Sequence, residues 1–378
     1  MTKTYGNFTD FVDFSRSSSA TYLGSDGLIK TAANNIPRVE YDANGVVKGL
    51  LIEEARTNYT ITSSDFSVNW SLGRTGVSVE HGGVSDPAGG TSASTFTYSG
   101  VNAAEGILDD LTANGNTTYT FSIWLKSLTL SEARLVVKNR SSDTVKAQAI
   151  VNLTSEWQRF SVTGTTDGAS TGTRLEFTTN GASGSMDIWG AQLEQGSFPT
   201  SYIPTAGATA TRAADIASIA TANFGYNKGA GTVVVNFDNL KFGAGGSGFP
   251  RPVELGSSAH AGERINFYVA ESSGNFAFGI NTANAAQAGG TLVASTTSPV
   301  GPYKAGIAYK KDNVAAVETG GDVLTDTSAD ISGVVYSRDT LKIGGSTIAT
   351  THQVNGHIKS IKYLPRRLTN TQLQEQTA

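Results

Sequence analysis

The chain has 378 residues, of which 43 are Gly, 16% are charged and none is Cys. This length exceeds one typical domain of roughly 100 to 200 residues and favours two domains. The lack of Cys excludes disulfides, thiolate nucleophiles and Cys-based zinc sites, and a net charge of −4 disfavours nucleic acid as the main ligand.

The composition predicts an all-β protein. Gly, Ser, Thr and Asn are abundant between short apolar runs of period two, a pattern typical of many strands joined by tight turns. No apolar run approaches the ~20 residues of a membrane helix, and the initial "MTKTYGNFTDF" lacks the apolar core of a signal peptide. We therefore expect no membrane insertion, and a protein that stays where it is made unless an assembly carries it out.

Residues 1–58 are predicted to contain two β-hairpins. "TYLGSDGLIKT" and "RVEYDANGVVKGLLI" place an Asp-Gly and an Asn-Gly pair, which end at Gly27 and Gly45, between strand-like runs. Each hairpin is too small to bury a core alone. We expect this segment to pack against the next domain or against neighbouring copies of the chain.

A charged cluster follows in "LLIEEARTN". Glu53 and Glu54 beside Arg56 would suit a catalytic carboxylate pair. A surface turn held by salt bridges is the simpler interpretation, and we expect that turn.

Residues 59–205 show the spacing of strands and turns that is typical of a jelly roll. In "TTYTFSIWLKS", alternation places Trp124 and Lys126 on the polar outer face. The inner face of this strand is predicted to be core and carries Tyr119, Phe121, Ile123 and Leu125. Further strands are expected at residues 133–139, 147–153, 157–165, 173–179 and 185–194.

Residues 206–378 are predicted to form a second sandwich. An extended connector at 196–215, with two Pro and no clear periodicity, carries the domain boundary. Long loops are expected at 242–252 and 281–302, and such loops on a rigid sheet are where a ligand site is usually found. Strands are expected at residues 231–239, 263–270, 275–280, 303–311, 313–318, 339–345 and 356–365.

A short helix is predicted at the end of the chain, in "TNTQLQEQTA". Pro365 stops the last strand, and Thr369 with Gln372 three residues later forms a capping box. Leu368 and Leu373 are expected to face inward, so that the helix closes an open edge of the sandwich.

Three stretches resemble modules of bacteriophage tail and virion proteins. "GHIKSIKYLPRRLTNTQLQEQT" resembles the closing strand and helix of concanavalin A-like (laminin G-like) domains. "YTFSIWLKS", "EWQRFSVTGT" and "MDIWGAQLEQGSFPTSYIPT" resemble a carbohydrate-binding-module-like jelly roll. "FSRSSSATYLGSDGLIKTAANNIPRVEYDANGVVKGLLIEEARTN" resembles the segment that precedes this module in phage tail fibres. The resemblance implies a virion-attachment segment at 1–58, a jelly roll at 59–205 and a lectin sandwich at 206–378.

Glycan binding would use aromatic rings and polar side chains. Trp124 is the leading candidate platform, with Lys126 beside it, because sugar C–H faces stack on exposed rings. The alternative is that Trp124 packs against the N-terminal segment or another subunit. Trp157 and Trp189 occupy positions that resemble structural Trp of the family.

The second sandwich offers further candidates in or beside its long loops. Arg251, Arg264, Tyr268 and Tyr303 are predicted to line a shallow groove. A structural Ca²⁺ is a further option, although no D-x-D-x-D-G spacing is present. Its eligible oxygen ligands are Asp238, Asp322, Asp326 and Asp330.

Enzymatic activity finds little support in the sequence. The chain has no G-x-S-x-G elbow, H-E-x-x-H motif, P-loop or Rossmann glycine pattern. Glycan hydrolysis needs only two facing carboxylates, for which Glu80, Asp86, Glu105 and Asp109 are formally available. The chain lacks the short repeat of the parallel β-helix that phage depolymerases usually contain, and we expect no enzyme.

The resemblance therefore implies a virion protein of a tailed bacteriophage. We expect a tail fibre or receptor-binding appendage that attaches through residues 1–58 to other virion proteins and binds a host surface polysaccharide or lipopolysaccharide. Such appendages are usually homotrimers, although no heptad run supports a coiled-coil stalk. The alternatives are a structural protein of the capsid, collar or baseplate, and a glycan-cleaving tail spike.

Overall fold

The structure is a computed structural model, and it confirms the predicted all-β class. Its regular structure consists of antiparallel strands and short helical turns, ending in the helix α1 (Asn370–Thr377). Among the residues that the structure describes, no helix is long and apolar enough to cross a membrane. The structure describes residues 11–378 except 73–75, 101–105, 113, 171, 180, 242–248, 261, 270–275, 283–284, 294–302, 332–336 and 348–351.

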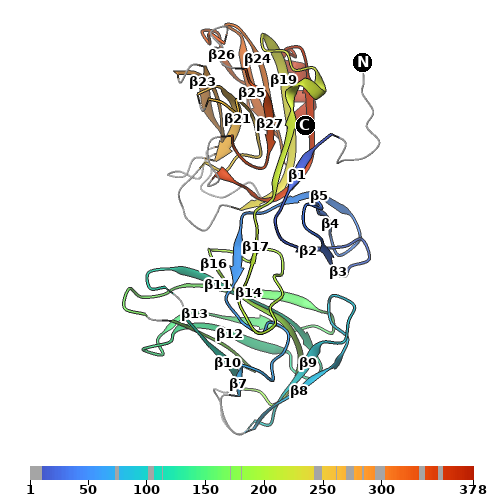
Figure 1. The fold of residues 1–378 in the computed structure, drawn as a ribbon, viewed down its shortest axis with the longest axis vertical. Helices are drawn as coiled ribbons and strands as arrows, with labels where there is room; N and C mark the ends of the chain where they lie inside the picture. Colours follow the sequence, from blue (N-terminus) through green and yellow to red (C-terminus); the bar gives the residue numbers. More distant parts are fainter. Residues whose placement is uncertain are drawn as a thin grey trace. The chain divides into compact units, whose positions relative to one another are not determined.

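The chain forms two compact units, and each unit is built from separate stretches of sequence. Unit 1 comprises Met1–Ser17, Ala32–Glu54 and Ala213–Ala378, and unit 2 comprises Ser18–Thr31 and Ala55–Arg212. The strands of the first 58 residues, blue in Figure 1, are therefore shared between the two units.

Unit 1 is a sandwich of two seven-stranded sheets. Sheet I contains, in order, β1 (Asp13–Ser15), β18 (Ile216–Ala220), β27 (Thr340–Ile343), β20 (Val253–Gly256), β21 (Arg264–Val269), β22 (Phe276–Thr282) and β23 (Ala285–Val293). Sheet II contains β26 (Leu324–Asp326), β25 (Val314–Glu318), β24 (Tyr303–Lys310), β19 (Ala230–Lys241), β28 (Asn355–Leu364), β5 (Val47–Ile52) and β4 (Val39–Tyr41). A 3₁₀ turn, η2 (Thr221–Phe224), follows β18.

The core of unit 1 lies between these sheets, and α1 covers the outer face of sheet II. Leu373 is fully buried against Val234, Ala308 and neighbouring strand residues. The predicted capping box of Thr369 and Gln372 is confirmed. The expected position of α1 at an open edge is wrong: β24 and β25 offer a flat face of small residues, and α1 packs on that face.

A buried ionic network joins Arg16, Arg38 and Glu53 to the later part of unit 1. Asp215 accepts a hydrogen bond from Arg16 Nη1 at 3.0 Å and another from Arg38. Arg38 also pairs with Glu53 at 2.8 Å, and Gln353 donates to the Glu53 carbonyl at 3.0 Å. Both Arg side chains are fully buried, and Glu53 can compensate only one of them, so removal of Asp215 would leave one buried positive charge uncompensated.

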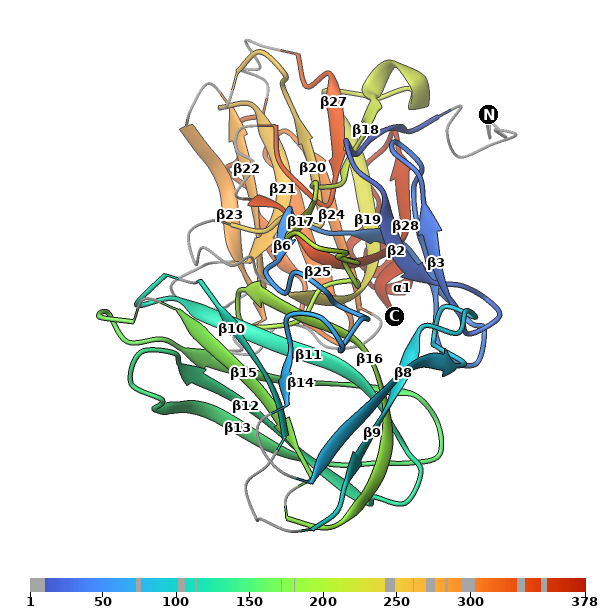
Figure 2. The same ribbon diagram turned by 60° about the horizontal axis from the view of Figure 1, so that its bottom comes forward.

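Unit 2 is a smaller sandwich of two five-stranded sheets, seen from below in Figure 2. Sheet III contains β13 (Val145–Asn152), β12 (Glu132–Asn139), β15 (Thr173–Thr178), β10 (Gly106–Leu111) and β7 (Ser71–Leu72). Sheet IV contains β14 (Gln158–Thr165), β11 (Thr118–Ser127), β16 (Gly184–Gln195), β9 (Ala93–Tyr98) and β8 (Val77–Val84). Two ribbons complete the unit: β2 (Ala20–Leu23) with β3 (Ile29–Ala32), and β6 (Arg56–Asn58) with β17 (Ala210–Arg212).

The local predictions for hairpins and for β11 are confirmed. Gly27 and Gly45 have φ of +76°, as the turns of the β2–β3 and β4–β5 hairpins require. The predicted inner residues of β11 are fully buried in the core of unit 2, and Trp124 lies on the opposite face. Alternation along a half-buried strand thus determined which face is core.

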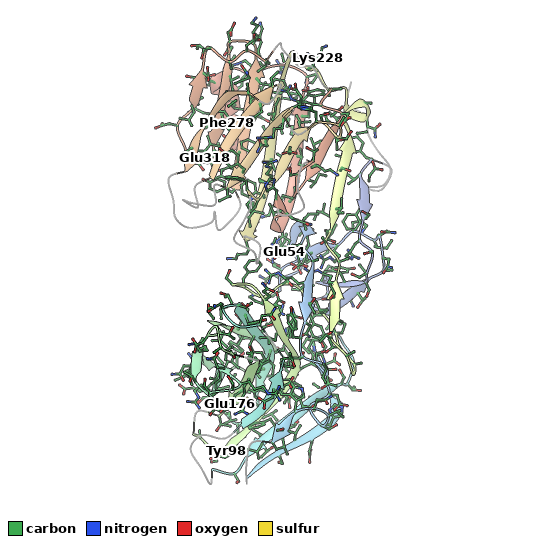
Figure 3. The ribbon with its side chains drawn as sticks, turned by 60° about the vertical axis from the view of Figure 1, so that its left-hand side comes forward. Glu54, Tyr98, Glu176, Lys228, Phe278 and Glu318 are labelled. Carbon is green, nitrogen blue, oxygen red and sulfur yellow. The ribbon has the colours of Figure 1, made fainter. Side chains whose placement is uncertain are left out.

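The expected surface turn at Glu53, Glu54 and Arg56 is wrong. Glu53 and Arg56 are each 4% exposed. Glu53 pairs with Arg38 in unit 1, whereas Arg56 pairs with Glu194 at 3.3 Å in unit 2. The chain passes from one unit to the other at Glu54 (Figure 3), so neighbours in sequence have partners in different units.

Candidate ligand-binding site

The candidate site is a hollow of 460 Å³ on the outer face of sheet I. It lies over β21, β22 and β23, and the core side chains of these strands point to the opposite face. Phe278, labelled in Figure 3, belongs to β22 beneath it. The side chains that give the hollow its chemistry are Phe249, Arg251, Arg264, Asn266 and Tyr268. Its volume falls in the range of ordinary small-molecule sites.

Glycines form the floor of the hollow. Gly279 of β22 is paired with Asn266 on one side and with Gly289 of β23 on the other. A Cβ at Gly279 would lie 3.3 Å from Asn266 Oδ1 and 3.5 Å from Tyr268 Cε1. Glycine weakens a strand interior, and its presence often marks a place where a ligand approaches the backbone.

The sequence did not predict this floor. Residues 281–302 were expected to be a loop, but "AAQAGGTLV" forms β23 and pairs with β22. Ala and Gly have low strand propensity, so the stretch reads as a turn until the neighbouring strand is known. Residues 294–302 and 242–248 of the two expected loops lie outside the described residues.

Arg251 is held at one end of the hollow by neighbours on β20, on β21 and in the segment after β27. Its Nη1 pairs with Glu254 and donates to Ser346 Oγ at 2.6 Å. In the amide orientation that satisfies both neighbours, Asn266 accepts from Arg251 Nε at 3.2 Å and donates to the Gly279 carbonyl at 3.1 Å. The guanidinium is therefore preorganised before any ligand binds.

Burial and a nearby cation destabilise positive charge at this end of the hollow. Arg251 is 4% exposed, and its burial, with repulsion from Arg264, lowers its pKa even though Glu254 opposes the shift. Burial, with repulsion from Arg251, also lowers the pKa of His352. His352 is therefore neutral at pH 7 and adds no charge.

An aromatic wall bounds the hollow. Tyr268 is half-buried and Phe249 is 42% exposed, and their rings meet edge to face at 5.7 Å. The ring of His352 lies 6.0 Å from that of Phe249. Tyr268 and Phe249 present apolar ring surface beside hydrogen-bond donors, an arrangement that suits a sugar ring.

The structure thus brings together three of the four residues predicted for this groove. Arg251, Arg264 and Tyr268 line the hollow, whereas Tyr303 packs against the unit 1 core, 5.6 Å from the ring of Phe237. The sequence analysis missed Phe249, Asn266 and Gly279. Glycine inside a predicted strand, at Gly279, was the signal that could have located the floor.

Trp124, the leading candidate in unit 2, lies in a closed cluster. Its ring meets Trp189 at 5.3 Å and Tyr202 at 5.4 Å, in both cases edge to face. The Arg159 guanidinium carbon lies 4.3 Å from the ring centroid. Any side chain at Gly190 would clash with the ring, because a Cβ there would lie 2.8 Å from Trp124 Cε3. Its own unit therefore covers Trp124.

Lys126, which was predicted to lie beside Trp124 in the binding platform, contacts Asp187 and Trp157 instead. Its Nζ lies 3.4 Å from Asp187 and 5.7 Å from the ring centroid of Trp157. Trp157 is half-buried and donates to the Ser85 carbonyl at 3.1 Å. These contacts hold the side chains against unit 2 instead of presenting them as a platform.

The formally available carboxylates occupy different environments. Glu80 is exposed on β8. Asp86 is satisfied within its own turn by Ala88, Gly90 and Ser92. Asp109 is paired with core Leu175, and burial, with repulsion from Asp110, raises its pKa to about 7. Glu105 lies outside the described residues.

The acids considered for Ca²⁺ have local partners. Asp238 lies 3.3 Å from Lys359, and Asp330 lies 3.8 Å from Lys311. Asp326 accepts from the backbone N–H of Ser328 at 2.8 Å, and Asp322 is exposed. Within the described ranges, no three His, Asp or Glu gather as metal ligands would.

The fold and the hollow define an all-β sandwich protein with a polar and aromatic hollow on one sheet. No known family model matches the chain, and no curated protein matches it. Solved structures with similar folds include a CBM4 structure, 19% identical, which covers 38% of this chain and 96% of its own, with a TM-score of 0.29.

Two further similar structures come from a bacterium and a phage. The CBM22-1 xylan-binding domain of a Paenibacillus barcinonensis protein is 13% identical and covers 37% of this chain and 92% of its own, with a TM-score of 0.29. The enzymatically active domain of tailspike protein 4 of bacteriophage CBA120 is 15% identical and covers 36% of this chain, with a TM-score of 0.31. This chain spans about a fifth, 21%, of that tailspike structure.

Proposed function

We propose that the protein binds a glycan in the hollow of sheet I, and that it does so as a tail fibre or receptor-binding appendage of a tailed bacteriophage. The observation that carries glycan binding is the combination of a glycine floor, an aromatic wall and fixed guanidinium and amide donors in one hollow. The phage context and the trimeric state rest on the resemblance of the sequence. The host partner would be a surface polysaccharide or lipopolysaccharide.

The geometry supports a simple binding mode. A sugar ring lying over Gly279 would place its C–H face against Tyr268, and its hydroxyls would be within reach of Asn281 and Arg264. Asn281 is paired with Arg264 across β22 and β21, so both side chains project from the same face. Shallow sites of this kind bind through a few well-placed contacts, not through large buried area.

We propose binding without cleavage. No Asp or Glu is among the described residues that line the hollow. A glycosidase needs two carboxylates across its substrate, and Glu254, which pairs with Arg251, is fully buried. Assaying released reducing ends in the binding tubes tests this part of the proposal, and their appearance would contradict it.

The hollow can be filled with a single substitution. Gly279→Leu would place a side chain in the space above β22, and we expect it to abolish binding to bacterial surface polysaccharides on an array. Gly229→Leu is the matched control, because Gly229 is exposed and a Cβ there has space. Wild-type binding by folded Gly279→Leu would place the glycan elsewhere.

If the wild-type protein binds no polysaccharide, the structural role in the capsid, collar or baseplate becomes the leading account. Unfolding curves of both variants must accompany the binding data. A folded Gly279→Leu variant shows that a loss of binding comes from the filled hollow.

Attachment to the particle is proposed to use residues 1–58. The β4–β5 hairpin supports this, because Val46 is 61% exposed and Val47 is 52% exposed at an edge of sheet II. Deleting the whole segment would remove β5, whose Ile52 is fully buried in the core. Val46→Asp with Val47→Asp is therefore the sharper test: folded protein missing from particles supports the proposal, and normal incorporation contradicts it.

A further inference from the structure

The hollow carries positive charge on a protein that is acidic as a whole. Arg251 and Arg264 line it, and none of its described lining residues is acidic. The full chain has a net charge of −4. Glu254 is fully buried and pairs with Arg251, so the net positive charge of the hollow comes from Arg264.

The fork of Arg251 is only partly used by the protein. Its Nε and Nη1 are held by Asn266, Glu254 and Ser346. In the part of the chain that the structure describes, Nη2 makes no hydrogen bond, and it is not among the buried atoms without a partner. A guanidinium with a fixed plane and an unused donor on a hollow is suited to a carboxylate.

We propose that the hollow selects an acidic sugar, a uronate or sialate residue whose carboxylate binds Arg251 and Arg264 while its ring lies against Tyr268. This inference rests on the proposed glycan binding and adds the chemical class of the glycan. Neutral sugars would lose the charge-assisted hydrogen bonds, so a preference of about 10- to 100-fold for the acidic form is expected.

The test compares each acidic glycan with its own uncharged form. Oligosaccharides of polygalacturonate, hyaluronate and polysialate are measured beside the same oligosaccharides after chemical reduction of their carboxylates to alcohols. A phosphorylated polysaccharide, before and after dephosphorylation, tests whether another anion serves equally. Binding of the full chain is measured at two salt concentrations, because charge-dependent binding weakens with ionic strength.

Two variants distinguish the effect of charge in the hollow from the effect of charge elsewhere on the surface. Arg264→Gln removes a cation from the hollow, and Lys228→Gln removes an exposed cation before β19 in the same unit (Figure 3). Both change the net charge equally. Arg251→Gln is not used, because it would leave Glu254 buried without its partner.

The expected result is binding of at least one carboxylated oligosaccharide at least tenfold tighter than its reduced form, with the difference lost in Arg264→Gln and kept in Lys228→Gln. Equal binding of native and reduced forms, abolished by Gly279→Leu, would overturn the acidic preference while leaving glycan binding in place. A preference for phosphate alone, or equal effects of both charge variants, would also overturn it. No binding to any acidic oligosaccharide overturns it, and failure with neutral glycans as well removes the proposed function.

Discussion

Two outward-facing aromatic side chains, Trp124 in unit 2 and Tyr268 in unit 1, have opposite environments. Each ring projects from the outer face of a sheet and has an arginine nearby. Trp124 is covered by Arg159 and by Tyr202, which belongs to the segment after β16. Tyr268 instead borders a hollow of 460 Å³.

The difference lies in what the rest of the chain places over each face. In unit 2, the segment that follows β16 returns across sheet IV, and Thr200 is tied down by Arg159 at 2.5 Å. In unit 1, the neighbouring strand positions are Gly279 and Gly289, which fill no space. An exposed aromatic on a strand therefore becomes a binding surface only where neighbours leave room for a ligand.

The largest effect that would test this comparison is expected from Trp124→Ala. Loss of a half-buried ring that packs on Trp189 and Tyr202 should lower the free energy of unfolding by about 3 kcal/mol. All four Trp of the chain lie in unit 2, so Trp fluorescence during urea denaturation reports this unit. Glycan binding by the folded variant should equal that of the wild type, and weaker binding would return Trp124 to the ligand site.

A change of pH should lower the stability of unit 2 without any substitution. The folded-state pKa of Asp109, about 7, lies above its ordinary value of 3.8. Between these values the folded state binds more protons than the unfolded state, so stability falls as pH rises. From pH 5 to pH 7 unit 2 should lose roughly 2 kcal/mol through this group, again measured by Trp fluorescence.

Two variants isolate the contribution of Asp109. Asp109→Asn should remove the decline with pH and exceed the wild type in stability at pH 8. Asp110→Asn is a second probe: the hydrogen bond from Arg174 lowers the pKa of Asp110, so this carboxylate is ionised from pH 5 upward and contributes no pH dependence of its own there. Loss of its charge removes a repulsion that raises the pKa of Asp109, so the decline with pH should become weaker. A decline that persists in Asp109→Asn would assign the pH dependence to another group.

Most of the secondary structure could be predicted from local patterns. Alternation in β11 identified its buried face, Gly27 and Gly45 marked the hairpins, and Thr369 with Gln372 marked the start of α1. These features depend on residues within a few positions of one another. Local sequence therefore contains the physical causes of these strand faces, hairpin turns and helix start.

The site depended on contacts that local sequence does not contain. The sequence predicted a surface turn for Glu53 and Arg56, but their partners, Arg38 and Glu194, lie in different units. Likewise, nothing near Trp124 announces that Tyr202 covers its ring. The sequence shows which arginine and tyrosine side chains could bind a ligand. Whether they can reach one depends on which distant segments of the chain cover them.

Tyr268→Ala should give the reverse of the Trp124→Ala result. Loss of one stacking ring should weaken glycan binding about tenfold, or about 1.4 kcal/mol. The free energy of unfolding should change less, because Tyr268 is half-buried beside an open hollow. Tyr41→Ala is the control: it removes a half-buried ring from β4 in the other sheet of unit 1. Calorimetric titration of both variants with a bound polysaccharide measures the contrast.

The smallest effect is expected from uncovering Trp124 with Arg159→Lys. Lysine keeps the charge but loses the fork that bonds the Thr200 carbonyl and Ser122 Oγ, so about 1 kcal/mol of stability should be lost. Trp124 fluorescence should become more accessible to a neutral quencher. If covering by Arg159 alone kept Trp124 from acting as a platform, this variant would gain binding to neutral glycans that the wild type does not bind. We expect no gain, because Gly190 and Tyr202 still occupy the space beside the ring.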